Sequence, residues 1–408
     1  MVQLADNNGI KELDKLLQKF LGEDKKIVKV ETKRLTSAGE NYGSQILAVE
    51  VHLQNKEILH LVAKMIPPNE WLKELFHTPI SFRKETEFYN TIIPAMKEFQ
   101  IQQGVSNVID CFPECYGARV SLYSNVVDDD AVILLENLKL SAFQVANRME
   151  GFDLETTKLL LQDMALLHAV PIAIKLSNPE EFNKKFLPYL EKNRKFNGLS
   201  KSAEKAIIDS IVKTIRTKQE LLPFMSNIEK SLKISMSNIQ NQTNSREPFA
   251  TLNHNDYWVN NTMIKFENGK IAKNKIVDFQ LIDYGSPGND IIFFLFSSVQ
   301  TKVIDEHYDD LIKLYYNKFI STLKELKCDT TMFTFKQLEE EINISAKSTQ
   351  FVHILIMLKH ILAGEGTVRE LSEMTEEDMV SEAQFSDEYR KKVPEVALEF
   401  VKRNWIYT

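Results

Sequence analysis

The chain has 408 residues, of which 43% are hydrophobic and 26% charged, and its formal net charge is −7 at pH 7. This length exceeds what one hydrophobic core usually supports, so we expect two lobes, and the ordinary composition excludes extensive disorder. The negative charge and the absence of a long Lys/Arg run argue against a nucleic-acid partner.

The cysteines and the apolar segments point to a cytoplasmic protein. Cys111, Cys115 and Cys328 are odd in number, which disfavours a disulfide framework, and no His/Cys pair completes a zinc site with Cys111 and Cys115. Free thiols in a reducing compartment are the better interpretation. Charges throughout residues 1–26 break any signal-peptide core, and the apolar run 291–299 is too short to span a bilayer.

The first third of the chain is predicted to be β-rich. A helical repeat of apolar residues at 10–21 comes first. Short connections then join three predicted strands into an antiparallel meander, at 27–35, 45–53 and 59–66. A helix is expected over 81–100, with Pro94 kinking or splitting it, and another strand over 131–135.

The pattern changes near residue 140. Helical periodicity is strong over 154–170 and fills most of 180–235, a short β section with one hairpin covers about 249–284, and helices follow from residue 290. We therefore predict an α+β fold with a β-rich N-terminal lobe, residues 1–138, and a mainly helical C-terminal lobe, residues 139–408.

The strongest chemical signal is a loop followed by a hairpin. Asp256 and Asn261 lie on a loop that leads into a strand, and Glu267-Asn268-Gly269-Lys270 has the composition of a hairpin turn. The returning strand ends at Asp278, so the hairpin brings Asn261 and Asp278 to the same end, with Asp256 beside them.

This arrangement suits phosphoryl transfer. Mg²⁺ prefers carboxylate and amide oxygens, which Asp278 and Asn261 offer, while Asp256 would orient a hydroxyl and accept its proton. His254 is expected to bond loop backbone rather than to act chemically. The alternative is a loop whose polar groups merely satisfy one another, and the length of the combined pattern disfavours it.

The first lobe supplies matching groups. Lys64 lies in an apolar strand, where an unpaired charge would be costly, so we expect it to pair with a helix carboxylate and with ATP phosphates. Glu85 is the candidate partner and Glu87 the alternative. The loop at 37–44, which contains Asn41, joins two strands as a phosphate-covering loop would, but its glycine spacing is a weak signal.

These motifs together resemble the insect ecdysteroid kinase-like family, which is related to choline kinases and aminoglycoside phosphotransferases. The resemblance covers almost the whole chain. It rests on the segments 39–44 (GENYGS), 82–89 (FRKETEFY), 134–138 (LLENL), 167–169 (LHA), 254–261 (HNDYWVNN), 277–280 (VDFQ) and 284–287 (YGSP), followed by Asp290.

The resemblance implies a protein-kinase-like fold with ATP and Mg²⁺ between the lobes. Asp256 would be catalytic, and Asn261 and Asp278 would hold the metal. The ATP-binding residues would be Lys64, Glu85, Asn41, Glu136 and Leu138, of which Glu136 and Leu138 belong to a hinge that meets adenine through its backbone. His254 and Asp290 would be structural, with Asp290 tying the C-terminal lobe to the catalytic loop.

The acceptor is expected to be a small molecule with a hydroxyl group. Gln280 replaces the glycine of protein kinases, and the short interval between Asp278 and Asp290 leaves no peptide-binding segment, so no protein substrate is expected. The resemblance favours an ecdysteroid or a similar polyhydroxylated apolar compound. A choline- or ethanolamine-type kinase and a nucleotide-binding pseudokinase that sequesters a ligand remain alternatives. Candidate acceptor contacts, each of which is also a candidate core residue, are Trp258, Phe293, Phe294, Phe296, Phe351, His353, Met357 and His360.

Overall fold

A five-stranded antiparallel sheet forms the N-terminal part of the protein. The computed structural model describes residues 9–22, 25–35, 44–67, 69–75, 77–191, 200–241, 245–364 and 375–408. The strand order is β1-β2-β3-β5-β4, with bounds β1 Ile27–Arg34, β2 Gln45–Leu53, β3 Ile58–Met65, β4 Cys115–Arg119 and β5 Val132–Glu136. The predicted meander is confirmed, whereas β4 was not predicted.

One face of this sheet is covered by α1 (Leu13–Leu21). Its apolar side packs on strand residues that include Val51 and Leu61, which makes a small core separate from the main one. The approach is close at Gly117 on β4, where a Cβ atom would lie 2.7 Å from the carbonyl oxygen of Leu16. Because side chains alternate across a strand, Lys64 of β3 projects from the face opposite to Leu61 and Ala63.

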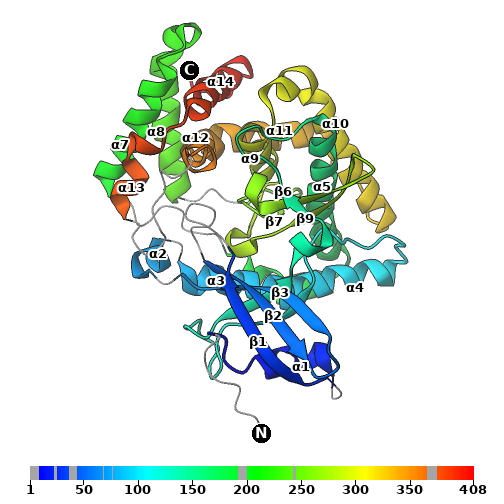
Figure 1. The fold of residues 1–408 in the computed structure, drawn as a ribbon. Helices are drawn as coiled ribbons and strands as arrows, with labels where there is room; N and C mark the ends of the chain where they lie inside the picture. Colours follow the sequence, from blue (N-terminus) through cyan, green and yellow to red (C-terminus); the bar gives the residue numbers. More distant parts are fainter. Residues whose placement is uncertain are drawn as a thin grey trace.

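Helices α3 and α4 run along the opposite face, as Figure 1 shows. The helix predicted over 81–100 is present but split into α3 (Thr78–Glu87), a π-helical turn (Phe88–Ile92) and α4 (Ile93–Gln103). Pro94 lies at the start of α4, directly after the π-helical turn, where its missing N–H removes one helical hydrogen bond. A short α2 (Glu70–Leu75) precedes α3.

The C-terminal lobe is a helical assembly around a large apolar core. The pair α5 and α10 packs side by side (Figure 1). The helices are α5 Leu154–Ser177, α6 Pro179–Lys185, α7 Lys201–Ile215, α8 Met225–Asn241, α9 Gly288–Ser298, α10 Thr301–Glu325, α11 Phe335–Ser345, α12 Phe351–Ile361, α13 Glu376–Val380 and α14 Asp387–Lys402. Within the described chain, only α5 is long and apolar enough to cross a membrane, and 67% of its most apolar stretch is buried in the protein interior.

Most of the candidate acceptor contacts belong to this core. Phe293, Phe294, Phe296 and Phe351 are at most 2% exposed, and the ring of His353 stacks on Phe293 with a centroid distance of 4.8 Å. These side chains therefore belong to the core, which is one of the two alternatives, core residue or acceptor contact, that the sequence left open.

Two small sheets lie between the helices and the five-stranded sheet. One pairs β7 (Thr251–Asn253) with β10 (Asp283–Gly285), and the other contains β6 (Gln144–Val145), β8 (Thr262–Glu267) and β9 (Lys270–Ile276). The predicted hairpin turn is confirmed, because both Asn268 and Gly269 have positive φ values, 53° and 74°, as a type I′ turn requires. The chain is thus an α+β protein with a β-rich first lobe and a helical second lobe; the boundary at residue 138 stays a prediction.

Candidate active site

The loop from His254 to Asn261 joins β7 to β8 and is held by one buried carboxylate. Asp290, in the first turn of α9, accepts hydrogen bonds from the backbone N–H groups of His254 (2.6 Å) and Asn255 (2.7 Å). Asn255 has a φ of 63°, a left-handed conformation that Asn tolerates better than most residues. The carboxylate of Asp290 therefore fixes the loop at a bend immediately before Asp256.

A second buried pair orients Asp290. The ring of His168 on α5 lies 3.1 Å from Asp290 Oδ2 through Nε2 and 2.8 Å from the Tyr315 hydroxyl through Nδ1. Burial would raise the pKa of Asp290, but the hydrogen bond and charge of His168 lower it below the ordinary value. His168 and Tyr315 were not predicted as site residues; the only sequence signal was the place of His168 in the family resemblance.

His254 is an internal brace of the loop. Its side chain is wholly buried, with Nε2 3.0 Å from the carbonyl oxygen of Val277, and Nδ1 accepts the backbone N–H of Asp256 at 3.2 Å. Burial lowers the pKa of His254, so the ring is neutral at physiological pH. These contacts join the loop to the end of β9, in the structural manner expected for this residue.

Asp256 and Asn261 are in direct contact. The Asn261 side-chain nitrogen donates to the backbone oxygen and to Oδ2 of Asp256, both at 2.8 Å. The two side chains are nearly buried, at 9% and 7% exposure. Because the amide nitrogen of Asn261 is committed to Asp256, its oxygen is turned away from Asp256.

Asp278 arrives at the same place from the end of β9. The backbone N–H of Val277 donates to the carbonyl oxygen of Asn261 at 3.0 Å, which brings the two ends of the hairpin together as expected. Asp278 itself has φ 69° and ψ 68°. A non-glycine residue in this left-handed region stores strain of about 1–3 kcal/mol, which the surrounding contacts must offset.

Lys64 lies between two carboxylates. Its ammonium group is 2.6 Å from Glu85 Oε2 and 2.7 Å from Asp278 Oδ1. The ion pair with Glu85 was expected, while the contact with Asp278 was not. Burial would lower the pKa of Lys64, but the charges of Asp278 and Glu85 raise it above its ordinary value.

Glu85, rather than Glu87, faces the site. Glu85 is fully buried on α3 and also accepts the backbone N–H of Phe279 at 3.3 Å, whereas Glu87 accepts the hydroxyl of Thr91. Burial raises the pKa of Glu85 to about 7, although Lys64 opposes this shift. The preceding residue, Lys84, is buried as well and donates to the carbonyl oxygen of Ile282 at 2.9 Å, so α3 is tied to the segment that follows Asp278.

An aromatic cluster packs behind these polar groups. The ring of Phe279 stacks on Phe88 at a centroid distance of 3.7 Å and lies 4.8 Å from the ring of His254. Phe112 packs edge-on against Phe279 at 5.5 Å. The cluster connects the π-helical turn of the first lobe to the loop 254–261.

The predicted hinge lies at the end of β5, apart from the Lys64 cluster. Glu136 pairs with Leu61 of β3, three residues along the strand from Lys64, a separation of roughly 10 Å. The backbone N–H of Glu136 donates to the carbonyl oxygen of Glu114, and Leu138 begins a 3₁₀ helix. Asn41 lies outside the described residues.

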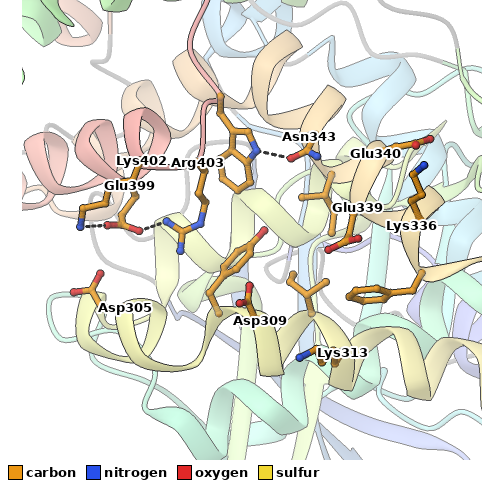
Figure 2. A pocket seen from close by; sticks show the side chains of 15 residues that line it. Asp305, Asp309, Lys313, Lys336, Glu339, Glu340, Asn343, Glu399, Lys402 and Arg403 are labelled. Atoms are coloured by element: carbon orange, nitrogen blue, oxygen red, sulfur yellow. Dashed lines mark hydrogen bonds and ion pairs between the residues drawn. The ribbon is translucent and has the colours of Figure 1, made fainter.

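A hollow of about 950 Å³ lies elsewhere, between α10, α11 and α14 (Figure 2). None of the predicted site residues lines it. The Arg403 guanidinium lies 4.4 Å from the ring centroid of Tyr308 at this hollow, and the Trp405 indole donates to Asn343 at 2.6 Å. Most of its polar lining residues are charged, and they carry both signs.

Several solved structures are similar to the chain. Among solved structures, the chain is similar to a spectinomycin phosphotransferase in complex with ADP and spectinomycin, with 11% identity, a TM-score of 0.40, and coverage of 90% of this chain and 93% of that chain. It is also similar to an aminoglycoside 2'-phosphotransferase with bound GDP, with 11% identity, a TM-score of 0.42, and coverage of 96% of this chain and 98% of that chain. A macrolide 2'-phosphotransferase shares 12% identity, with a TM-score of 0.32 and coverage of 81% of this chain and 86% of that chain.

The family assignment comes from the sequence match. No curated protein matches the sequence. The model of the ecdysteroid kinase-like family matches residues 38–328, which contain strands β2 to β5 of the five-stranded sheet, the loop 254–261 and both ends of the hairpin. Because this match covers well over half of the chain, the protein belongs to the ecdysteroid kinase-like family, and its enzyme class is that of a phosphotransferase.

Proposed function

We propose that the protein transfers the terminal phosphoryl group of ATP to a hydroxyl group of a small polyhydroxylated apolar molecule of the ecdysteroid type. One observation carries the proposal: the Lys64–Glu85–Asp278 ion pairs and the Asp256–Asn261 pair meet at the two ends of one hairpin. A cation, two oxygen ligands and a separate carboxylate are the groups that phosphoryl transfer requires.

ATP is proposed to bind between the lobes. Lys64 would neutralise phosphate oxygens, with Glu85 holding the ammonium group in place. Leu138 is the first residue of a 3₁₀ helix, so its N–H has no partner within that helix, and together with the carbonyl of Glu136 it suits an adenine ring. Asn41 would contribute from the loop before β2.

The donor set beside Asp256 fits Mg²⁺. The Asn261 amide oxygen is turned away from Asp256, and Asp278 keeps 15% of its side chain exposed, so a carboxylate and an amide oxygen are available from adjoining positions. When bound, the cation would neutralise charge on the phosphate oxygens of the nucleotide. Asp278 must then share its charge between the metal and Lys64.

Asp256 is proposed to be the catalytic base. The amide of Asn261 holds its Oδ2 and backbone oxygen, which fixes the orientation of the carboxylate. The acceptor oxygen forms a bond to the γ-phosphorus, the bond from that phosphorus to the bridging oxygen of ADP breaks, and the hydroxyl proton passes to Asp256. The neutral ring of His254 takes no part in this proton transfer.

The same structure supports a small acceptor over a protein. The segment between Asp278 and α9 consists of a short 3₁₀ turn and β10, which is paired with β7, so no extended stretch remains there to bind a peptide. The family description supports an ecdysteroid-like acceptor. The free thiols of Cys111, Cys115 and Cys328 support a cytoplasmic location.

The test is a transfer assay with labelled ATP, Mg²⁺ and a panel of ecdysteroids, choline, ethanolamine and phenolic glycosides. We expect a phosphorylated ecdysteroid, and we expect Asp256→Asn to reduce the rate by about 10²–10⁴-fold, the usual contribution of a general base. Asp309→Asn, an exposed carboxylate on α10, is the matched control and should retain full activity.

Each other outcome has a defined meaning. Transfer to choline or ethanolamine alone would replace the acceptor but keep the mechanism. ATP binding without transfer to any member of the panel would favour the pseudokinase. Full activity in Asp256→Asn would contradict the role of Asp256.

A further inference from the structure

A polar network joins the loop 254–261 to α5 and β9. Tyr257 follows Asp256 directly and is wholly buried, and its hydroxyl donates to the carbonyl oxygen of Leu160 on α5 at 3.1 Å. The side-chain nitrogen of Asn274 lies 3.4 Å from the same hydroxyl and 3.3 Å from Oδ2 of Asp163. The loop residue next to the proposed base is therefore connected to β9 and α5, which pack against each other (Figure 1).

Asn274 is an unusual residue for its position. It lies within β9, is only 3% exposed, and its Oδ1 atom is buried without a hydrogen-bond partner among the described residues. A buried polar group without a partner costs about 1–3 kcal/mol, so packing alone does not explain an amide here. Its nitrogen, by contrast, contacts both the Asp163 carboxylate and the Tyr257 hydroxyl.

The ring of Tyr257 transmits this anchoring to the loop. It packs edge-on against His254, with centroids 5.7 Å apart, and against Phe294 of α9 at 5.3 Å. His254 in turn accepts the backbone N–H of Asp256. A shift of the Tyr257 ring would therefore displace the His254 ring as well as Tyr257 itself, and both residues contact or adjoin Asp256. A misplacement of about 1 Å can cost about 10²-fold in rate.

We propose that Asn274, held by Asp163, is a positioning residue that anchors the Tyr257 hydroxyl and thereby fixes the carboxylate of Asp256 for transfer. The inference rests on the proposed function for its effect on rate. Its structural part, the restraint of the loop, stands on the contacts alone.

Asp163 gives the network a pH dependence. Burial raises the pKa of Asp163 to about 7, with the hydrogen bond from Asn274 opposing the shift. Above that pH the carboxylate accepts from the Asn274 nitrogen; below it, protonated Asp163 is a weaker acceptor and a donor for the Asn274 oxygen, which requires the amide to turn. The other titratable groups that face Asp163 are Lys318 on α10, Lys275 on β9, Asp110, Cys111 and Tyr257.

The experiment uses the full chain and three substitutions: Tyr257→Phe, Asn274→Leu and Asp163→Asn. Amide hydrogen exchange of residues 250–262 is measured from pH 5.5 to 8.5, corrected for intrinsic exchange, beside kcat and KM for ATP. We expect faster loop exchange and a kcat about tenfold lower in Tyr257→Phe and Asn274→Leu, with KM for ATP within about twofold of wild type. In wild type, loop protection and kcat should rise through an inflection near pH 7, which Asp163→Asn should remove.

The matched control is Tyr316→Phe. Its hydroxyl also donates to a backbone carbonyl, but that of Phe333 at 2.8 Å, which is outside the loop 254–261 and its contacts, so loop exchange and kcat should not change. Equal effects of Tyr257→Phe and Tyr316→Phe, or an unchanged pH profile in Asp163→Asn, would overturn the inference. If Asn274→Leu does not fold, Tyr257→Phe still tests the inference, because it removes only one oxygen atom. If wild type transfers no phosphate, the proposed function fails, while the exchange measurements still test the restraint of the loop.

Discussion

Lys64 balances two carboxylates in a site that excludes most water. Its side chain is 6% exposed, that of Glu85 is 1% exposed and that of Asp278 is 15% exposed. A single cation in this place offsets the desolvation of Glu85 and the proximity of the two acids to each other. Removing the cation would leave two like charges close together with little solvent to screen them.

Lys64→Met should therefore destabilise the protein as well as inactivate it. We expect the free energy of unfolding to fall by about 3 kcal/mol, the usual cost of leaving a buried charge without its partner. Urea unfolding at pH 8, where Glu85 is ionised in wild type, measures the loss.

A double variant separates the ion pair from the loss of packing. Lys64→Met combined with Glu85→Leu removes both charges, and it should recover part of the stability lost in the single variant. A double variant that is less stable than Lys64→Met would contradict this account, because no charge would then remain on Glu85 to explain the loss.

The sequence identified these residues because each breaks a local rule. A lysine in an apolar strand and an aspartate that ends one are both visible without a structure. The choice between Glu85 and Glu87 depends on the phase of α3 and on the π-helical turn after it, which periodicity alone does not fix. The bond between Lys64 and Asp278 joins residues 214 positions apart and depends on how the lobes meet.

The loop 254–261 is an element held in large part by Asp290. Asp290 accepts the two backbone N–H groups that precede Asp256, and His168 contacts Asp290 in turn. The two oxygen atoms of Asp290 each accept one of these amides, so the loop depends on the ionised form of Asp290.

Asp290→Asn should weaken the protein in a pH-dependent manner. The folded pKa of Asp290 lies below its unfolded value of about 3.9, so its contribution is complete above pH 3.9 and is lost as the pH falls through the folded pKa. At pH 7 we expect the variant to lose about 2–3 kcal/mol of unfolding free energy, since an amide offers one acceptor where the carboxylate offers two. The difference from wild type should narrow toward pH 3, as urea midpoints at both pH values would reveal.

The exposed Asp309→Asn substitution is the control, and it should leave the urea midpoint unchanged at both pH values. A stability difference between Asp290→Asn and wild type that stays constant from pH 7 to pH 3 would show that the charge of Asp290 is not what holds the loop.

Elements with strong local signals were predictable, and those defined by distant partners were not. The meander follows from the alternation of apolar and polar residues, and the hairpin turn follows from Asn268-Gly269. The break before Pro94 follows from the missing proline N–H. β4 pairs only with β5 and contains Gly117, and β7 and β10 are short strands that pair with each other across the loop and hairpin. Such segments form because a partner from elsewhere in the chain satisfies their backbone.

At the scale of the whole molecule, polar contacts join the lobes along one side. Besides Lys64, the buried ammonium of Lys84 reaches Ile282, and Lys275 of β9 donates to the carbonyl oxygens of Asp110 and Phe112 at 2.8 Å. The helical lobe packs its Phe-rich segments into its own core, so sequence could not separate acceptor contacts from packing residues. The same apolar side chains serve either purpose, and only their exposure distinguishes them.

Nucleotide should strengthen this connection between the lobes in a metal-dependent manner. A ligand present at 100 times its Kd stabilises the folded state by about 2.7 kcal/mol, so ATP with Mg²⁺ should raise the thermal midpoint of wild type, and EDTA should reverse most of the shift. In Asp278→Ala, Lys64 and Glu85 still pair, but one proposed metal ligand is gone, so Mg²⁺ should add little to the shift produced by ATP alone. Each variant is compared with its own ligand-free midpoint, because Asp278→Ala also removes an ion pair. Asp309→Ala should behave as wild type, and a full Mg²⁺-dependent shift in Asp278→Ala would show that the cation is held elsewhere.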